Sequence, residues 1–167
     1  MNAEKVAALA GTYSLLMILG ALGFQYIGGV LPCEMCHWQR WPHDGAIVVG
    51  IGGALLYAAG LIDRKIVTAL AALALLLIAV SGGIGAYQAL VEWKLVLGPA
   101  SCTGPRFVLG AHADLNGSVV RCDVAGWRLF GISLAGYNAL ISWAVVCLGA
   151  LALLGKLPLP SFGNRHD

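Results

Sequence analysis

The chain has 167 residues, of which 59% are hydrophobic and only 11% are charged, and its formal net charge is +2. A soluble domain carries about 25% charged residues, so this chain lacks the polar groups that a water-facing surface needs. The composition therefore excludes an ordinary soluble protein, and the small net charge gives no indication of nucleic-acid binding.

Four long stretches of the sequence contain no charged residue. Each comes close to or exceeds the ~20 residues with which a helix crosses the hydrocarbon core of a bilayer. Backbone groups in lipid must form their hydrogen bonds within their own segment, so these stretches should be helices. We predict an all-α integral membrane protein, a single domain over residues 1–167 that forms a four-helix transmembrane bundle. The predicted helices are Val6–Ile27, Pro42–Ile62, Ile66–Val91 and Leu129–Leu154.

The first apolar stretch follows Lys5, as the hydrophobic region of a signal peptide would. The apolar region of a signal peptide has only ~7–15 residues, however, and this stretch is longer. We therefore expect a retained membrane helix.

The sequence PCEMCHWQR follows the first predicted helix and carries a C-x-x-C motif, Cys33 and Cys36. Two thiols at this spacing can form a redox-active disulfide or supply half of a zinc site. If the segment is helical, Cys36 and Arg40 are four residues apart on one face. The guanidinium would then favour the Cys36 thiolate and could donate hydrogen bonds to a carbonyl of a bound ligand. Alternatively, Arg40 is an interfacial anchor beside Trp38 and Trp41.

Pro42 allows two starts for the second helix. The helix begins near Pro32 with a kink at Pro42, or Pro42 is its first residue. The short turn Asp63–Lys65 makes the second and third helices antiparallel neighbours. Small residues in both allow close approach in lipid, so we interpret them as packing residues. They are Gly45, Gly50, Gly52, Gly53 and Ala54 in the second helix and Ser81, Gly82, Gly83, Gly85 and Ala86 in the third.

The loop Glu92–Arg128 is the only sizeable stretch expected in water, and it contains Cys102 and Cys122. Cys102 lies between two Gly-Pro pairs, which oppose regular structure, so we expect it on an exposed, irregular segment. A structural disulfide between these cysteines and a four-cysteine zinc site are both alternatives to a redox role. Four cysteines allow three pairings. Cys147, inside the last helix, is interpreted as a packing residue, because apolar surroundings make a thiol inert.

Positive charge does not decide the orientation, because five basic residues lie on each side of the predicted bundle. Arg64 and Lys65 fill a three-residue turn, and this density favours a cytoplasmic location for both termini. The four loop cysteines lie on the opposite face, which must be in an oxidising compartment if they form disulfides.

PCEMCHWQR, the later pair Cys102 and Cys122, and CDVAGWRLFGISLAGYNALIS before and within the last helix resemble the DsbB family of quinone-dependent disulfide-forming membrane proteins. The resemblance covers nearly the whole chain. It implies a thiol oxidase in the bacterial inner membrane, with several spans, both termini in the cytoplasm and two cysteine-bearing periplasmic loops.

The resemblance also implies an electron relay. A reduced DsbA-like thioredoxin-fold protein of the periplasm would attack Cys102, and the freed Cys122 would exchange with the Cys33–Cys36 disulfide through Cys33. Cys36 would then pass electrons to a membrane quinone, with ubiquinone favoured over menaquinone.

Three residues are candidates for contact with this quinone: Arg40, by analogy with the family, together with Gln39 and Gln88. Gln88 and Ala89 stand where some relatives carry a histidine. Gln88 can donate a hydrogen bond but cannot titrate. We predict no metal ligand.

A vitamin-K-epoxide-reductase-like quinone oxidoreductase is the nearest alternative enzyme, since it uses similar chemistry. The non-enzymatic alternatives are a membrane protein with a four-cysteine zinc or thiol-metal site and a structural four-helix membrane protein with incidental disulfides.

Overall fold

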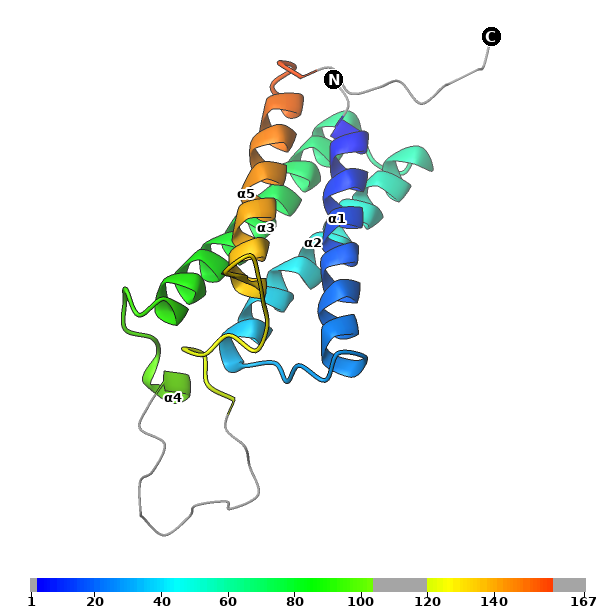
Figure 1. Cartoon of the computed structure of the whole chain (residues 1–167). Helices are drawn as coiled ribbons and strands as arrows, with labels where there is room; N and C mark the ends of the chain where they lie inside the picture. Colours follow the sequence, from blue (N-terminus) through cyan, green and yellow to red (C-terminus); the bar gives the residue numbers. More distant parts are fainter. Residues whose placement is uncertain (1–2, 104–119, 158–167) are drawn as a thin grey trace.

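The computed structural model describes residues 3–103 and 120–157, and these residues are mainly helical. Four long helices pack side by side (Figure 1). A four-residue helix, α4, and two short antiparallel strands lie between the last two of them. The elements are α1 Ala3–Tyr26, α2 Glu34–Ala58, α3 Arg64–Glu92, α4 Ala100–Thr103, β1 Arg128–Leu129, β2 Ile132–Ser133 and α5 Leu134–Leu153.

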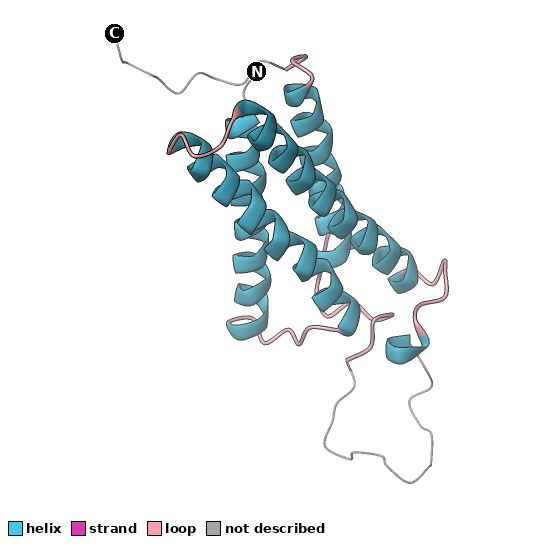
Figure 2. Cartoon of the chain, turned by 180° about the vertical axis from the view of Figure 1, so that it is seen from behind, coloured by secondary structure: helices cyan, strands magenta, loops and turns pink. Residues whose placement is uncertain are grey.

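The long helices run between two ends of the bundle. The beginning of α1 and the end of α5 lie at one end, and the α1–α2 connection and α4 lie at the other (Figure 1). The view from behind shows the same arrangement, with loops gathered at both ends (Figure 2). The C-x-x-C motif at the beginning of α2 and Cys102 in α4 therefore lie at one end of the bundle, and the beginning of α1 and the end of α5 lie at the other.

Three helices, α1, α3 and α5, are long and apolar enough to cross a membrane among the residues described. The protein is therefore a helical membrane protein. The second predicted helix differs from expectation, because α2 begins at Glu34 rather than at Pro42 and carries Glu34, Arg40 and Asp44 in its first half. These charges keep its hydropathy below that of the other three long helices.

Local chemistry explains the observed helix boundaries. Cys33 caps α2, with its sulfur accepting a hydrogen bond from the amide of Cys36, so the helix starts near Pro32 and contains Pro42. The last helix begins at Leu134 rather than at Leu129. Phe130 and Gly131 have φ angles of 49° and 81°, which turn the chain into the β1–β2 hairpin before the helix can start.

The small residues divide into two groups. A Cβ on Gly50 would lie 2.7 Å from the carbonyl oxygen of Ala7, and one on Gly82 would lie 2.9 Å from the Ser142 Cβ. These glycines allow α1 to approach α2 and α3 to approach α5, as a packing role predicts. Gly52 and Gly83 have no such neighbour among the residues described. They are not needed for close approach.

The sequence led us to expect Cys147 inside the bundle, and this expectation is wrong. Cys147 is a free, exposed cysteine on the outer face of α5. The buried face of this helix is instead formed by small and polar side chains, including Asn138 and Ser142. Apolar neighbours in the sequence do not indicate that Cys147 is buried, because the lipid-facing surface of a membrane helix is apolar as well.

The close approach at Gly50 predicts a specific instability. Gly50→Ala should lower the free energy of unfolding by about 1–3 kcal/mol, because the added methyl group meets backbone atoms of α1 that cannot move aside easily. Gly52→Ala in the same helix is the matched control and should cost little. Thermal unfolding in detergent micelles measures both. Equal stability of the two variants would contradict the packing that we describe.

Candidate redox site

The four loop cysteines form two disulfides, Cys33–Cys36 and Cys102–Cys122. The Cα atoms are 5.0 Å and 5.5 Å apart, respectively. Both pairs belong to one cluster of buried side chains, together with Met35. Among the three possible pairings the structure therefore contains this one, and it brings the two pairs against each other.

Cys102 is buried rather than exposed, and it lies in α4 rather than on an irregular segment. The carbonyl of Pro99 accepts hydrogen bonds from the amides of Cys102 and Thr103, so the first Gly-Pro pair begins a helical turn instead of preventing one. The disulfide and the contact with Cys33 exclude water from its side chain. The second Gly-Pro pair, at 104–105, lies outside the described residues.

The C-x-x-C motif occupies the first turn of α2. A helix N-terminus favours negative charge, so this position stabilises a thiolate when the disulfide is reduced. Both sulfurs also face a hydrogen-bond donor from α3. Gln88 Nε2 lies 3.4 Å from Cys33 Sγ and 3.7 Å from Cys36 Sγ. Reduction of the disulfide would thus place negative charge on sulfur atoms that already face backbone amides of the helix N-terminus and the side-chain amide of Gln88.

The Gln88 amide is oriented by a chain of side-chain amides in the bundle. Its Oε1 accepts a hydrogen bond from Gln39 Nε2 at 2.6 Å, and Gln39 Oε1 accepts one from Asn138 Nδ2 at 2.8 Å. Asn138 Nδ2 also donates to Ser81 Oγ at 3.1 Å. With its oxygen occupied in this way, Gln88 must turn its N–H groups toward the disulfide.

The buried polar network also extends to α1. His43 is buried, and its ring nitrogens lie 3.1 Å from Ser14 Oγ and 3.1 Å from Asn138 Oδ1. Ser142 Oγ donates to Asn138 Oδ1 at 3.0 Å and contacts the Tyr13 hydroxyl. Polar side chains inside apolar membrane helices usually have a partner or a function, so Ser14, Asn138 and Ser142 are a sequence signal for this network.

Arg40 lies one turn beyond Cys36 on α2 and reaches toward α1. Its Nη1 donates to Gln25 Oε1 at 2.8 Å, and its Nη2 donates to the Ala21 carbonyl at 3.5 Å. A guanidinium carries five N–H donors. Among the described residues, these two contacts use two of them.

A cavity of about 380 Å³ joins these groups. Its lining is mostly apolar and comes from α1, α2, α3, α5 and residues 120–129. The polar part of the lining includes Cys33, Cys36, Gln39, Arg40, Gln88 and Glu92. The structure thus brings the first cysteine pair together with all three residues that the sequence analysis chose as quinone contacts. Cys102 and Cys122 lie outside the described lining.

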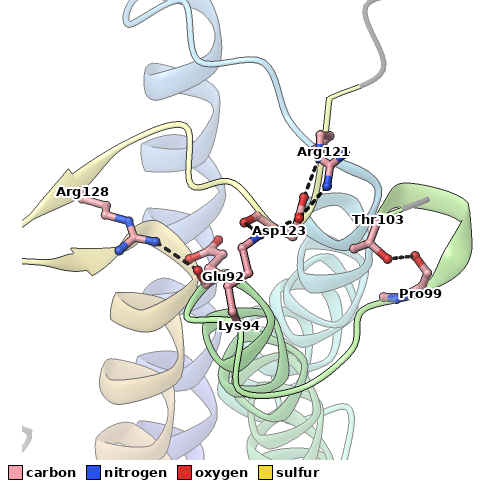
Figure 3. Close-up of polar contacts among 7 residues, drawn as sticks. All are labelled: Glu92, Lys94, Pro99, Thr103, Arg121, Asp123 and Arg128. Atoms are coloured by element: carbon pink, nitrogen blue, oxygen red, sulfur yellow. Dashed lines mark hydrogen bonds and ion pairs between the residues drawn. The ribbon is translucent and has the colours of Figure 1, made fainter. Parts of the chain in front are cut away.

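An ion cluster fixes the segment that carries Cys122 (Figure 3). Asp123 Oδ2 lies 2.5 Å from Lys94 Nζ and 2.6 Å from Arg121 Nη2, and Arg121 Nε donates to Asp123 Oδ1 at 2.8 Å. The hydrogen bonds from Arg121 and then Lys94 hold the pKa of the Asp123 carboxyl far below its usual range. Because Lys94 follows α3, the cluster ties the Cys122 segment to the bundle.

The described residues contain no group of three or more His, Cys, Asp or Glu side chains placed to hold a metal ion. A zinc site would also need thiolates, and all four loop cysteines form disulfides.

Comparison with known proteins gives one family match. A family model described as "Disulfide bond formation protein DsbB" matches residues 3–152 of the chain. Neither the curated proteins nor the solved structures give a match. The family match confirms the resemblance that the cysteine motifs predict.

The Asp123 cluster predicts a pH dependence for the Cys122 segment. Because the folded pKa is lowered, the carboxylate stabilises the segment fully above the ordinary aspartate pKa of about 3.9, and this stabilisation is lost as the pH falls below it. Backbone hydrogen exchange, corrected for the intrinsic rate, should be slow at residues 121–124 from pH 8 to pH 5 and faster below about pH 4.

Asp123→Asn should exchange rapidly across this range, and its difference from the wild type should vanish at low pH. Asp63→Asn, at the other end of the bundle, is the control and should leave these residues unchanged. Equal protection of the wild type and Asp123→Asn at pH 7 would show that the ion cluster does not hold this segment.

Proposed function

This chain belongs to the DsbB family, and from that premise we propose that it re-oxidises a DsbA-like periplasmic thioredoxin-fold protein and passes the electrons to a membrane quinone. The family's activity is quinone-dependent disulfide-bond formation in a membrane. The observation that carries the proposal is the position of the Cys33–Cys36 disulfide. It lines the apolar cavity beside Arg40 and also packs against the Cys102–Cys122 disulfide.

The first step of the proposed relay takes place on the loop. A thiolate of the reduced partner attacks Cys102, so that a mixed disulfide forms and Cys122 leaves as a thiolate. The second thiol of the partner then attacks the mixed disulfide and releases the oxidised partner. The Cys102–Cys122 pair now holds the two electrons and two protons that the partner has lost.

The second step is supported by the contact between the two pairs. The Cys122 thiolate attacks Cys33, and Cys102 completes the exchange, so that the loop disulfide re-forms and Cys33 and Cys36 become a dithiol. Cys33, Cys102 and Cys122 are buried in one cluster. The exchange therefore needs only a local rearrangement rather than a large movement of the loop.

The cavity fits a quinone headgroup by its chemistry. Pockets for small ligands have volumes of about 300–1,000 Å³, with mostly apolar linings and a few polar groups, and this one agrees. A bound quinone would accept two electrons and two protons. Arg40 would hold a carbonyl oxygen with its remaining N–H donors, and Gln88 would stabilise charge on the sulfurs. Gln39, whose amide is already engaged, would orient Gln88.

Redox energetics favour a quinone as the acceptor. A DsbA-type protein has a potential of about −120 mV, whereas thioredoxin lies near −270 mV and protein disulfide isomerase near −180 mV. For a two-electron couple, each 30 mV in the wrong direction costs about 1.4 kcal/mol. An ordinary dithiol protein would therefore reverse the reaction. Among the quinones, ubiquinone is the first to test.

We also propose that all four long helices cross the inner membrane, within a single domain and with both termini in the cytoplasm. The 25 residues of α2 give a helix of about 37 Å, longer than the ~30 Å hydrocarbon core. Both disulfides lie at the bundle end that holds the beginning of α2 and α4, opposite the beginning of α1 and the end of α5 (Figure 1). Disulfides persist in oxidising compartments such as the periplasm, which supports this orientation.

The relay order predicts which cysteine captures the partner. A thioredoxin-fold partner that lacks its second active-site cysteine should form a stable mixed disulfide with Cys102, since no second thiol can resolve it. Mass spectrometry of the linked peptides identifies the cysteine. Cys102→Ser should abolish the complex, and Cys147→Ser is the control that should not. A complex through Cys33 would reverse the proposed order.

Arg40 is expected to act on the acceptor and not on the partner. Arg40→Met should raise the KM for quinone about 10- to 100-fold, because a charge-assisted hydrogen bond contributes about 1.5–3 kcal/mol. The rate of mixed-disulfide formation with the partner should not change. Arg64→Met, at the other end of the bundle, is the matched control. Normal quinone kinetics in Arg40→Met would show that Arg40 does not bind the quinone.

A further inference from the structure

Glu92 is a buried carboxyl group that the proposed relay has not yet used. It is the last residue of α3, it is only 6% exposed, and it lines the same cavity as Cys33 and Cys36. Its Oε1 accepts a hydrogen bond from Gln88 Nε2 at 3.0 Å. Its Oε2 is buried and has no hydrogen-bond partner among the residues described.

An unpaired carboxyl oxygen in a buried position is unusual. Burying a polar group without a hydrogen bond costs free energy, so such a group in a native protein calls for an explanation, and a redox or catalytic role is one. The backbone carbonyl of Glu92, not its carboxyl group, faces Arg128, whose Nη2 lies 3.5 Å away (Figure 3). The carboxyl group is therefore held by one neutral donor, and its second oxygen is available to a proton.

Gln88 connects this carboxyl group to the disulfide. The same amide nitrogen donates to Glu92 Oε1 at 3.0 Å and contacts Cys33 Sγ at 3.4 Å. The carboxyl oxygen and the sulfur thus lie around one nitrogen atom. Both residues also line the same cavity, through which a proton can pass from one to the other.

The other ionisable groups of the described cavity lining already have partners. The ring nitrogens of His43 contact Ser14 and Asn138, and the Tyr137 hydroxyl donates to the Leu129 carbonyl. Arg121 pairs with Asp123, and Arg40 is a permanent cation. Lys94, beside Glu92 in the sequence, pairs with Asp123 as well.

We propose that Glu92 holds a proton of the Cys33–Cys36 centre while that centre changes its redox state; this rests on the proposed function. Re-forming the disulfide from the dithiol breaks two S–H bonds, makes one S–S bond, and releases two electrons and two protons. A quinone acceptor takes up both electrons and both protons, so the reaction balances. Glu92 receives one proton from a thiol and releases it into the cavity, where the reduced acceptor gains it.

Glu92→Gln separates this role from a structural one. The glutamine keeps an oxygen that can accept the hydrogen bond from Gln88, but it cannot take up a proton. Glu34→Gln is the matched control, because Glu34 is an exposed acidic residue next to the same motif. Oxidised Glu92→Gln should unfold at the temperature of the wild type, which shows that the fold is retained.

The first readout uses protein free of quinone. With both pairs reduced, the rate of alkylation of Cys33 and Cys36 is measured against pH. Glu34→Gln should keep the wild-type profile. In Glu92→Gln the profile of the thiols should shift, because they have lost the neighbouring group with which they exchange a proton. A Glu92→Gln profile equal to that of the wild type would overturn the proposal.

The second readout is quinone-linked turnover. Glu92→Gln should slow it about 100-fold, the lower range for a lost acid–base group, and Glu92→Asp should recover part of the rate. Mixed-disulfide formation with the partner should be unaffected. A wild type without turnover would contradict the proposed function, whereas a wild type and a Glu92→Gln variant with equal turnover and equal pH profiles would contradict only the role of Glu92.

Discussion

The side-chain amide of Gln88 is the contact on which the redox site depends. It accepts a hydrogen bond from Gln39, donates to Glu92 and faces both sulfurs of the Cys33–Cys36 disulfide. Since Gln39 is in turn held by Asn138, the N–H groups of three amides point the same way along a chain that ends at the disulfide. Such chains strengthen each member, and a buried network of this kind fixes one arrangement of the helices around it.

This arrangement separates two environments at one end of the bundle. On one side, the Cys33–Cys36 disulfide borders a mostly apolar cavity whose lining includes Arg40 and Glu92. On the other, the Cys102–Cys122 disulfide lies under a loop segment that Lys94, Arg121 and Asp123 tie to α3. One protein can therefore react with an electron donor in water and with an electron acceptor in lipid. Only the two disulfides need to exchange between the sides.

Much of this site could be predicted from the sequence. Cys33 and Cys36 are three residues apart and Arg40 follows four residues after Cys36, so local helical geometry was enough to place Arg40 on the face of Cys36. The departure at Gln88 was also visible, because some relatives carry a histidine at Gln88 or Ala89. The family match then confirmed what these motifs indicated.

Other features depended on contacts between distant segments and were missed. The burial of Cys102 results from packing against Cys33, about seventy positions away, and no local pattern in a Gly-Pro-rich loop reveals such a contact. The predicted loop Glu92–Arg128 begins one residue too early, because Glu92 is the last residue of α3 and lines the cavity. Of the two starts that Pro42 allows for the second helix, the structure has the earlier one, because Cys33 caps α2.

The central claim is that electrons leave the protein from the Cys33–Cys36 pair to a quinone in the membrane. The most direct measurement follows quinone absorbance and partner thiols together, in anaerobic vesicles that contain the purified protein and ubiquinone. The account predicts that one quinone is reduced for each partner dithiol oxidised and that Cys36→Ser abolishes both changes. Oxidation of the partner with unchanged quinone absorbance, or full turnover by Cys36→Ser, would contradict it.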